Sequence, residues 1–141
     1  KISYTYENFY LYGAVEPITG ENFFLQMPYL NSACFQIFLN EFAEVYPTSL
    51  NILVLDNGRF HHARSLQIPD NVLLLFLPPY CPELNPIERL WQDIKARLFD
   101  TLFTSIKDMQ DKLFEILRSY TKDTIASITK YEYLTKIENE I

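Results

Sequence analysis

Glycine and cysteine are scarce in this 141-residue chain, which has 3 glycines and 2 cysteines. Neither Cys34 nor Cys81 lies in a CxxC pattern, so the sequence favours two free thiols in a reducing cytosol over a disulfide framework. The chain also has no glycine- or serine-rich tract and no internal repeat. We therefore expect residues 1–141 to form a single domain.

Long hydrophobic runs are missing as well. The longest run, residues 72–77 (VLLLFL), is far below the ~18 apolar residues that span a bilayer. The N-terminus shows no basic region followed by an apolar run, as a signal peptide would. These absences predict a soluble, cytoplasmic protein without a membrane partner.

Positive charge is in short supply, since 12 Lys and Arg residues face 18 Asp and Glu residues and the formal net charge is −6. An acidic chain is a poor general binder of DNA, because phosphate binding depends on Lys and Arg displacing counterions. If DNA is the substrate, a separate basic module, a metal ion or a local basic rim has to supply the affinity. Hydrophobic residues, by contrast, make up 48% of the chain, which supports a real core and excludes a disordered chain.

Hydrophobic periodicity predicts an α/β domain. Apolar and β-branched runs bounded by turn residues indicate four strands, at residues 8–15 (NFYLYGAV), 22–27, 50–55 (LNILVL) and 72–77. The first two are expected to form a hairpin, with the first strand in the interior of a sheet. The third is nearly all apolar and the fourth is continuously apolar, which is typical of parallel strands covered on both faces.

Helix signals separate and follow these strands. Asn31 or Ser32 caps a helix that Pro47 ends, and a short helix is expected within residues 58–70. After a proline-rich loop, Asn85 is a good N-cap with Pro86 at the first helical position. Another helix is predicted to start at Ser105, and the tail, residues 123–141, is expected to be helical.

Two acidic residues stand where a sheet of this kind binds ligands. Asp56 directly follows the strand at 50–55, and Glu88 lies on the first turn of the helix after the next strand. Ligands of open α/β sheets bind at the carboxyl ends of the parallel strands, and paired carboxylates there suit Mg²⁺ or Mn²⁺. The sequence pattern alone also allows structural roles for both acids. Asn85 and Glu88 have the spacing of a capping box, and Asp56 is also a common strand-end turn residue.

Longer stretches around these acids resemble one family. Residues 53–66 (LVLDNGRFHHARSL) and 73–98 (LLLFLPPYCPELNPIERLWQDIKARL) closely resemble the DDE superfamily endonuclease domain of bacterial insertion-sequence transposases related to mariner elements, and residues 11–24 (LYGAVEPITGENFF) resemble it too. The resemblance implies a ribonuclease H-like fold, whose mixed sheet combines an antiparallel hairpin with parallel strands between flanking helices. Residues from about 104 to 141 would be a helical C-terminal extension.

The resemblance also implies an activity, DNA transposition by metal-dependent hydrolysis and strand transfer at transposon ends. Asp56 and Glu88 match the second and third of the family's three catalytic carboxylates, which hold two Mg²⁺ or Mn²⁺ ions. One ion would activate water or a DNA 3′-OH, and the other would stabilise the leaving oxygen. The candidates for contacts with DNA are Asn57, Arg59, His61, His62, Arg64 and Lys95. Asn57 equally suits a turn, and His61 equally suits a helix cap.

The chain departs from the family at the first carboxylate. No aspartate precedes Asp56, and Glu7 is the sole substitute. We therefore expect the first strand of the sheet to be missing and this chain to be catalytically incomplete. The gap would be closed by residues 1–7, by pairing of strand 8–15 with strand 51–55, or by a partner chain, as in a homodimer.

Two other functions remain open from the sequence. One is a non-enzymatic, oligomerising remnant of a transposase. The other is a metal-dependent nuclease completed by another acid or subunit. A DNA substrate would place any of the active forms at the nucleoid.

Overall fold

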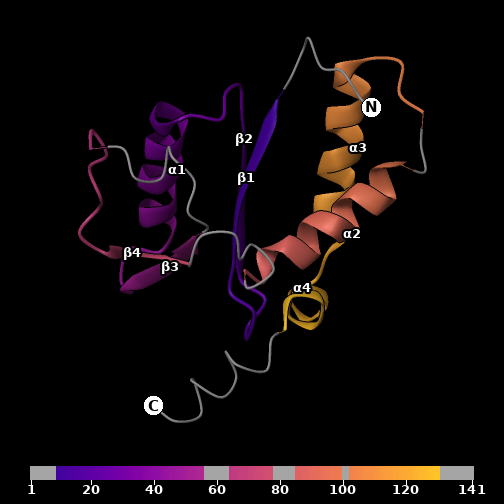
Figure 1. Ribbon diagram of the computed structural model, residues 1–141. Helices are drawn as coiled ribbons and strands as arrows, with labels where there is room; N and C mark the ends of the chain where they lie inside the picture. The colour runs from indigo at the N-terminus through magenta and orange to yellow at the C-terminus, as the bar shows by residue number, and fades with distance from the viewer. Residues whose placement is uncertain (1–8, 56–63, 78–84, 100–101, 131–141) are drawn as a thin grey trace. The chain divides into compact units, whose positions relative to one another are not determined.

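The computed structural model of the chain describes residues 9–55, 64–77, 85–99 and 102–130. Its elements follow the order β1-β2-α1-β3-β4-α2-α3-α4 (Figure 1), which confirms the α/β class. The chain folds as two compact units, Lys1–Ala14 with Phe23–Asn85, and Val15–Asn22 with Pro86–Ile141. Most of the β1–β2 hairpin thus belongs to the first unit, and its turn belongs to the second.

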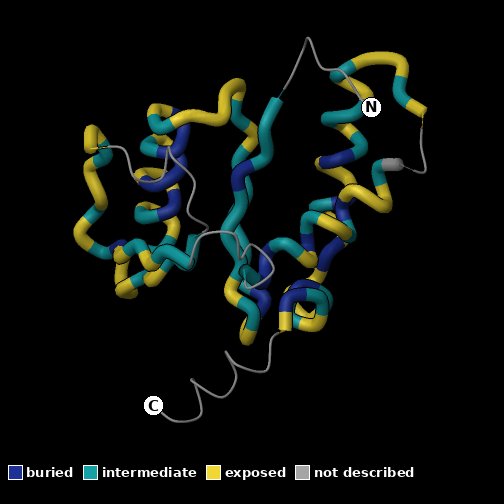
Figure 2. The backbone as a smooth tube through the Cα atoms, in the orientation of Figure 1, coloured by how far each residue is buried: buried dark blue, intermediate teal, exposed yellow. Residues whose placement is uncertain are grey.

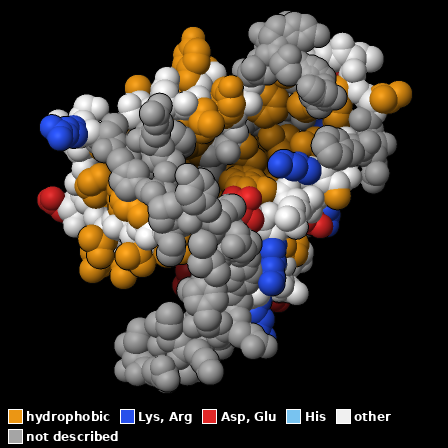
Figure 3. Space-filling model, viewed as in Figure 1, with side chains coloured by type: hydrophobic (Ala, Val, Ile, Leu, Met, Phe, Trp, Pro, Cys, Tyr) orange, Lys and Arg blue, Asp and Glu red, His pale blue; other side chains and the backbone are white. Residues whose placement is uncertain are grey.

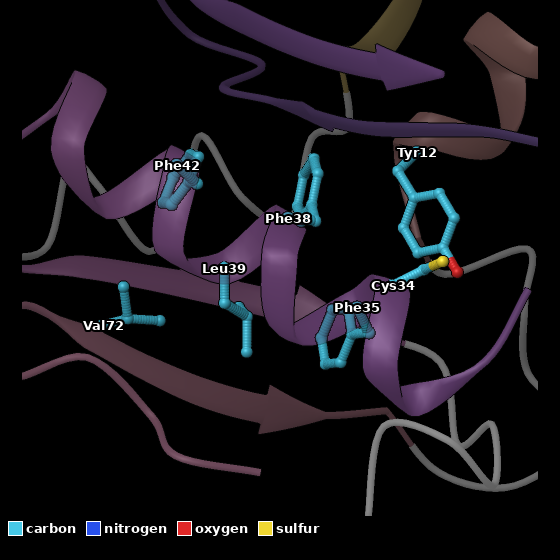
Figure 4. Packing of buried hydrophobic residues seen from close by; sticks show 7 residues of the cluster. All are labelled: Tyr12, Cys34, Phe35, Phe38, Leu39, Phe42 and Val72. Carbon is cyan, nitrogen blue, oxygen red and sulfur yellow. The ribbon is translucent and has the colours of Figure 1, made fainter. Parts of the chain in front are cut away.

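Helix α1 (Ser32–Val45) organises the core of the first unit. Asn31 caps it as predicted, because its Oδ1 accepts a hydrogen bond from the Cys34 amide at 2.9 Å. The buried side of α1 faces the hairpin (Figure 2). Tyr12 of β1 and Val72 of β4 complete the cluster shown in Figure 4, together with Cys34, Phe35, Phe38, Leu39 and Phe42. The apolar side chains of this helix therefore form the core of the unit.

The strands form two separate pairs among the described residues. β1 (Tyr10–Val15) pairs with β2 (Asn22–Met27) as the predicted hairpin, and β3 (Asn51–Leu55) runs parallel to β4 (Val72–Phe76). An antiparallel pair, a parallel pair and helices are compatible with a ribonuclease H-like fold. The expectation of an interior first strand differs from the structure, since β1 has one strand neighbour in the described part of the chain. Direct pairing of β1 with β3 is not formed there either.

One face of the β3–β4 pair is covered, and the other is open. Leu53 and Leu74 stand opposite each other in register and pack against the α1 core. Ile52, Leu73 and Leu75 point the other way and are 56%, 54% and 55% exposed. Figure 3 shows hydrophobic side chains gathered over β3 and β4. Coverage on both faces was expected, but among the described residues of the first unit α1 covers one face. Residues 64–70, the described part of the crossover, form turns and irregular backbone with no second helix.

An asparagine ties the amino end of β4 to the end of α1. Asn71 Nδ2 donates hydrogen bonds to the carbonyl oxygens of Ala43 at 3.2 Å and Tyr46 at 2.9 Å. These carbonyls lie at the C-terminal end of α1, where the helix itself supplies no donor. The side-chain amide therefore satisfies the helix end and fixes the strand that follows the crossover.

The described part of the second unit contains three helices, α2 (Ile87–Phe99), α3 (Ile106–Ser119) and α4 (Lys122–Thr129). Ser105 caps α3 as predicted, its Oγ accepting from the Asp108 amide at 3.1 Å. Their inward side chains include Ile87, Leu90, Ile94, Leu113, Ile116 and Ile125. α4 confirms helix in the first part of the predicted tail, and residues 131–141 lie outside the described residues.

The hairpin turn packs on the start of α4 within this unit. Gly20 is buried and has a left-handed backbone, with φ of +80°. A Cβ atom added at Gly20 would lie 1.8 Å from the carbonyl oxygen of Lys122. Glu21 forms an ion pair with Lys122 beside this contact. The turn can therefore approach α4 this closely only because position 20 has no side chain.

No helix among the described residues is long and apolar enough to cross a membrane.

Candidate active site

The carboxyl ends of β3 and β4 lie side by side. The Leu77 amide donates to the Leu55 carbonyl at 2.7 Å, one residue beyond the last paired residue of β4. The prediction that both strands end at the same edge of a sheet is thus confirmed. Asp56 is the next residue after Leu55, and it lies outside the described residues. Ligands of parallel sheets bind at such an edge, so this edge is the candidate site.

Glu88 is the acidic residue on the first turn of α2. The turn begins before the helix proper, because the Arg89 amide donates to the Pro86 carbonyl at 3.2 Å. Glu88 is half-buried there. A helix N-terminus carries partial positive charge and stabilises a carboxylate by about 0.3–1 kcal/mol. The predicted position of Glu88 at a helix start is therefore confirmed.

Asn85 precedes α2 and reaches β3. Its Nδ2 donates to the Val54 carbonyl at 3.5 Å, a contact that is partly buried. Sequence reasoning gave Asn85 only a capping role and missed this contact. No local pattern could have shown it, because the two residues are 31 positions apart.

A cluster of three side chains, Asp93, Arg97 and Tyr120, connects α2 to the end of α3. Tyr120 Oη donates to Asp93 Oδ2 at 2.5 Å, and Arg97 Nε lies 3.0 Å from the same oxygen. The Arg97 guanidinium also stacks 4.8 Å above the centre of the Tyr120 ring. Tyr120 is buried, and burial raises the pKa of its phenol, which the hydrogen bond to Asp93 raises further. The Arg97 side chain is therefore engaged within the protein. The cluster holds the helix that carries Glu88.

The contacts among Tyr120, Asp93 and Arg97 should make the free energy of unfolding depend on pH. Tyr120→Phe should lower the free energy of unfolding by about 1–2 kcal/mol near pH 7, because it removes a hydrogen bond to a carboxylate. Above pH 10 the unfolded phenol ionises while the folded one, with its raised pKa, keeps its proton. The folded state then binds more protons, so wild-type stability falls as the pH rises.

Urea unfolding of both proteins from pH 7 to pH 11.5 measures this effect. The difference in free energy of unfolding between wild type and Tyr120→Phe should shrink above pH 10. Ionisation of the other tyrosines affects both proteins equally, so it does not contribute to this difference. A gap that stays constant over the whole range would show that the Tyr120 proton is not held by this cluster.

The structure describes two of the six candidate residues for contacts with DNA. Asn57, Arg59, His61 and His62 lie outside the described residues, whereas Arg64 and Lys95 are described and exposed. Lys95 stands seven residues after Glu88, so both lie on nearly the same side of α2, two turns apart. Among the described residues, no three His, Cys, Asp or Glu side chains gather as a metal site.

Comparison with known proteins points to one family. A family model described as DDE superfamily endonuclease matches residues 3–110. An uncharacterized protein of Sinorhizobium fredii (strain NBRC 101917 / NGR234), y4pE/y4sA, is 39% identical over 102 residues. That alignment covers 71% of this chain and 76% of the other protein. The family match extends over both acid-bearing segments.

Proposed function

Because the chain belongs to the DDE superfamily endonucleases, we propose that it is the catalytic core of a DNA transposase. Its reaction would be hydrolysis and transfer of phosphodiester bonds at transposon ends. The observation that supports this most is the shared carboxyl edge of β3 and β4, where the Leu77 amide meets the Leu55 carbonyl at 2.7 Å. Asp56 follows that edge directly in the sequence, and the loop after β4 leads to Glu88.

In this proposal Asp56 and Glu88 are the carboxylates that bind the metal. Carboxylate oxygens are the hard ligands that Mg²⁺ and Mn²⁺ prefer, and the family generally uses divalent metals, so the donor chemistry fits. Bound ions supply charge neutralisation and activation of the attacking oxygen. The protein holds Glu88 at a helix start, and the hydrogen bond between Tyr120 and Asp93 fixes that helix against α3.

Contacts with DNA would come from a local basic rim, because the net charge of −6 opposes general phosphate binding. Lys95 lies two turns from Glu88 on nearly the same side of α2, which suits a phosphate next to the reacting one. Arg64 is exposed and available in the same way. We assign Asn57, Arg59, His61 and His62 to the same rim. Such an enzyme would work at the nucleoid in the cytoplasm.

The remaining carboxylate, the first of the family's three, cannot be an aspartate upstream of Asp56 in this chain, since residues 1–55 contain no aspartate. Glu7, an acid outside residues 1–141, or an acid of a second copy in a homodimer are the three sources. Each would complete a family-like set with Asp56 and Glu88.

Manganese binding by this chain tests the proposed site. Titration followed by the electron paramagnetic resonance of free Mn²⁺ should show binding, and Asp56→Asn and Glu88→Gln should each weaken it by about 10-fold or more, since each removes a ligand. Asp70→Asn is the matched control, because Asp70 is exposed and precedes the amino end of β4. Equal affinity in all four proteins, or no binding by the wild type, would refute the site.

A further inference from the structure

Residues 64–70, the described part of the crossover between β3 and β4, form turns and irregular backbone. Backbone polar groups in such a segment have no helix or sheet partner, so side chains or water have to satisfy them. Arg64 is the basic residue of this segment, and it is exposed in a turn at residues 64–65. The place of its guanidinium therefore depends on what fixes the residues that follow the turn.

Gln36 of α1 fixes this segment at Gln67. Its Nε2 donates to the Gln67 carbonyl at 2.8 Å, and its Oε1 accepts from the Gln67 amide at 2.7 Å. One carboxamide thus pairs with both backbone groups of one residue, as two residues do in a hydrogen-bonded pair of antiparallel strands. The neighbouring Leu66 packs against the α1 core. The chain is therefore held at two consecutive residues directly after the turn that carries Arg64.

The Gln36 carboxamide is itself held in one orientation. Its Nε2 also donates to Asn40 Oδ1 at 3.0 Å, one helical turn further along α1. An amide side chain carries two N–H donors and one acceptor oxygen on a single planar group, so both donors and the acceptor have partners here. Glutamate and methionine have similar length, but neither carries the donor that reaches the Gln67 carbonyl.

We propose that Gln36 is a positioning residue, which holds the crossover so that Arg64 meets a DNA phosphate. The inference rests on the proposed function, in which Arg64 belongs to the basic rim. Gln36, Arg64 and Gln67 all lie in the first compact unit. A segment that is ordered before binding does not have to be ordered by the DNA, and this lowers the entropy cost of the contact. Without the bonds to Gln67, the turn loses its polar anchor and the phosphate contact is lost.

DNA binding without divalent metal tests this role separately from the metal site. Fluorescence anisotropy of a labelled DNA duplex in EDTA, at several NaCl concentrations, gives the affinity and its salt dependence. Each phosphate contact contributes about 0.9 to the slope of log affinity against log salt concentration. Gln36→Met keeps the length of the side chain and removes its hydrogen bonds. It should reduce the magnitude of this slope by about 0.9, as should Arg64→Ala, and the double variant should reduce it no further.

Asn71→Ala is the matched control for destabilisation. Asn71 ties the other end of the crossover to α1 through the carbonyls of Ala43 and Tyr46. The variant should lower the urea midpoint and leave the salt slope unchanged, because it does not touch the anchor next to Arg64. A loss of stability by itself does not change the number of phosphates that the folded protein contacts.

Equal reductions of the slope in Gln36→Met, Arg64→Ala and the double variant support the inference. If Arg64→Ala reduces the slope but Gln36→Met does not, the positioning role is wrong, although Arg64 stays in the rim. The role is also wrong if Arg64→Ala binds as the wild type does, if the double variant loses more, or if Asn71→Ala loses as much. A wild type that binds no DNA removes the basic rim and this inference together, whereas the Mn²⁺ titration still decides the metal site.

Discussion

Gly20→Ala is expected to lower the free energy of unfolding of the second unit by about 3 kcal/mol or more. Gly20 has φ of +80°, and a left-handed backbone costs a residue with a Cβ about 1–2 kcal/mol. The added Cβ would also lie 1.8 Å from the Lys122 carbonyl oxygen and 2.4 Å from its carbon. These are backbone atoms, so no side-chain rotation relieves the clash, and overpacking of this kind typically costs about 1–3 kcal/mol more.

The single tryptophan, Trp91 on α2, reports on this unit. Urea unfolding followed by its fluorescence should show a much lower midpoint for Gly20→Ala. Glu21→Gln is the matched control, because it removes the exposed ion pair with Lys122 but adds no atom at the contact. Exposed pairs contribute about 0–1 kcal/mol, so this variant should stay close to wild type. A Gly20→Ala midpoint equal to that of Glu21→Gln would contradict the packing of the turn on α4.

Local structure was largely predictable from the sequence. Alternating or continuous apolar runs gave all four strands to within two residues at each described end. Asn31 and Ser105 begin helices as expected, since their side chains accept hydrogen bonds from the first turn. These features depend on residues close together in the chain, which is why pattern reasoning finds them.

Contacts between distant segments were not predictable. Nothing near Gly20 in the sequence points to Lys122, and nothing near Asp93 points to Tyr120. The open face of the β3–β4 pair was also missed, because a continuously apolar strand looks the same whether one face or two are covered. Such features follow from how many elements pack around a strand, and no short window contains that information.

The candidate site lies between these cases. Periodicity places Asp56 after a strand and Glu88 on a first helical turn. The same pattern is also typical of a turn aspartate at Asp56 and of a capping-box glutamate at Glu88. The match to the DDE superfamily endonucleases over residues 3–110 decides the family. The hydrogen bond from Asn85 to the Val54 carbonyl comes from the structure alone, since these two residues are 31 positions apart.

Cleavage of supercoiled plasmid in Mn²⁺ should depend on a third carboxylate. The 141-residue chain has no aspartate before Asp56, so we expect it to nick DNA no faster than a protein-free control. Fusing an aspartate-bearing strand ahead of Lys1 should raise the rate at least ~10³-fold. Metal-ion catalysis lowers a barrier by several kcal/mol, and each 1.36 kcal/mol is worth about a factor of ten.

In the fused form, Asp56→Asn and Glu88→Gln should each return nicking to background, whereas Asp70→Asn should not. Fast nicking by the unfused chain that Asp56→Ala abolishes would instead indicate a nuclease completed by Glu7 or by a second copy. Glu7→Gln then separates these sources, because a second copy would make the rate depend on protein concentration. Failure of the fused form to nick, although it is folded, would favour a non-enzymatic remnant. Such a remnant keeps the two acids of the family without the geometry that makes them catalytic.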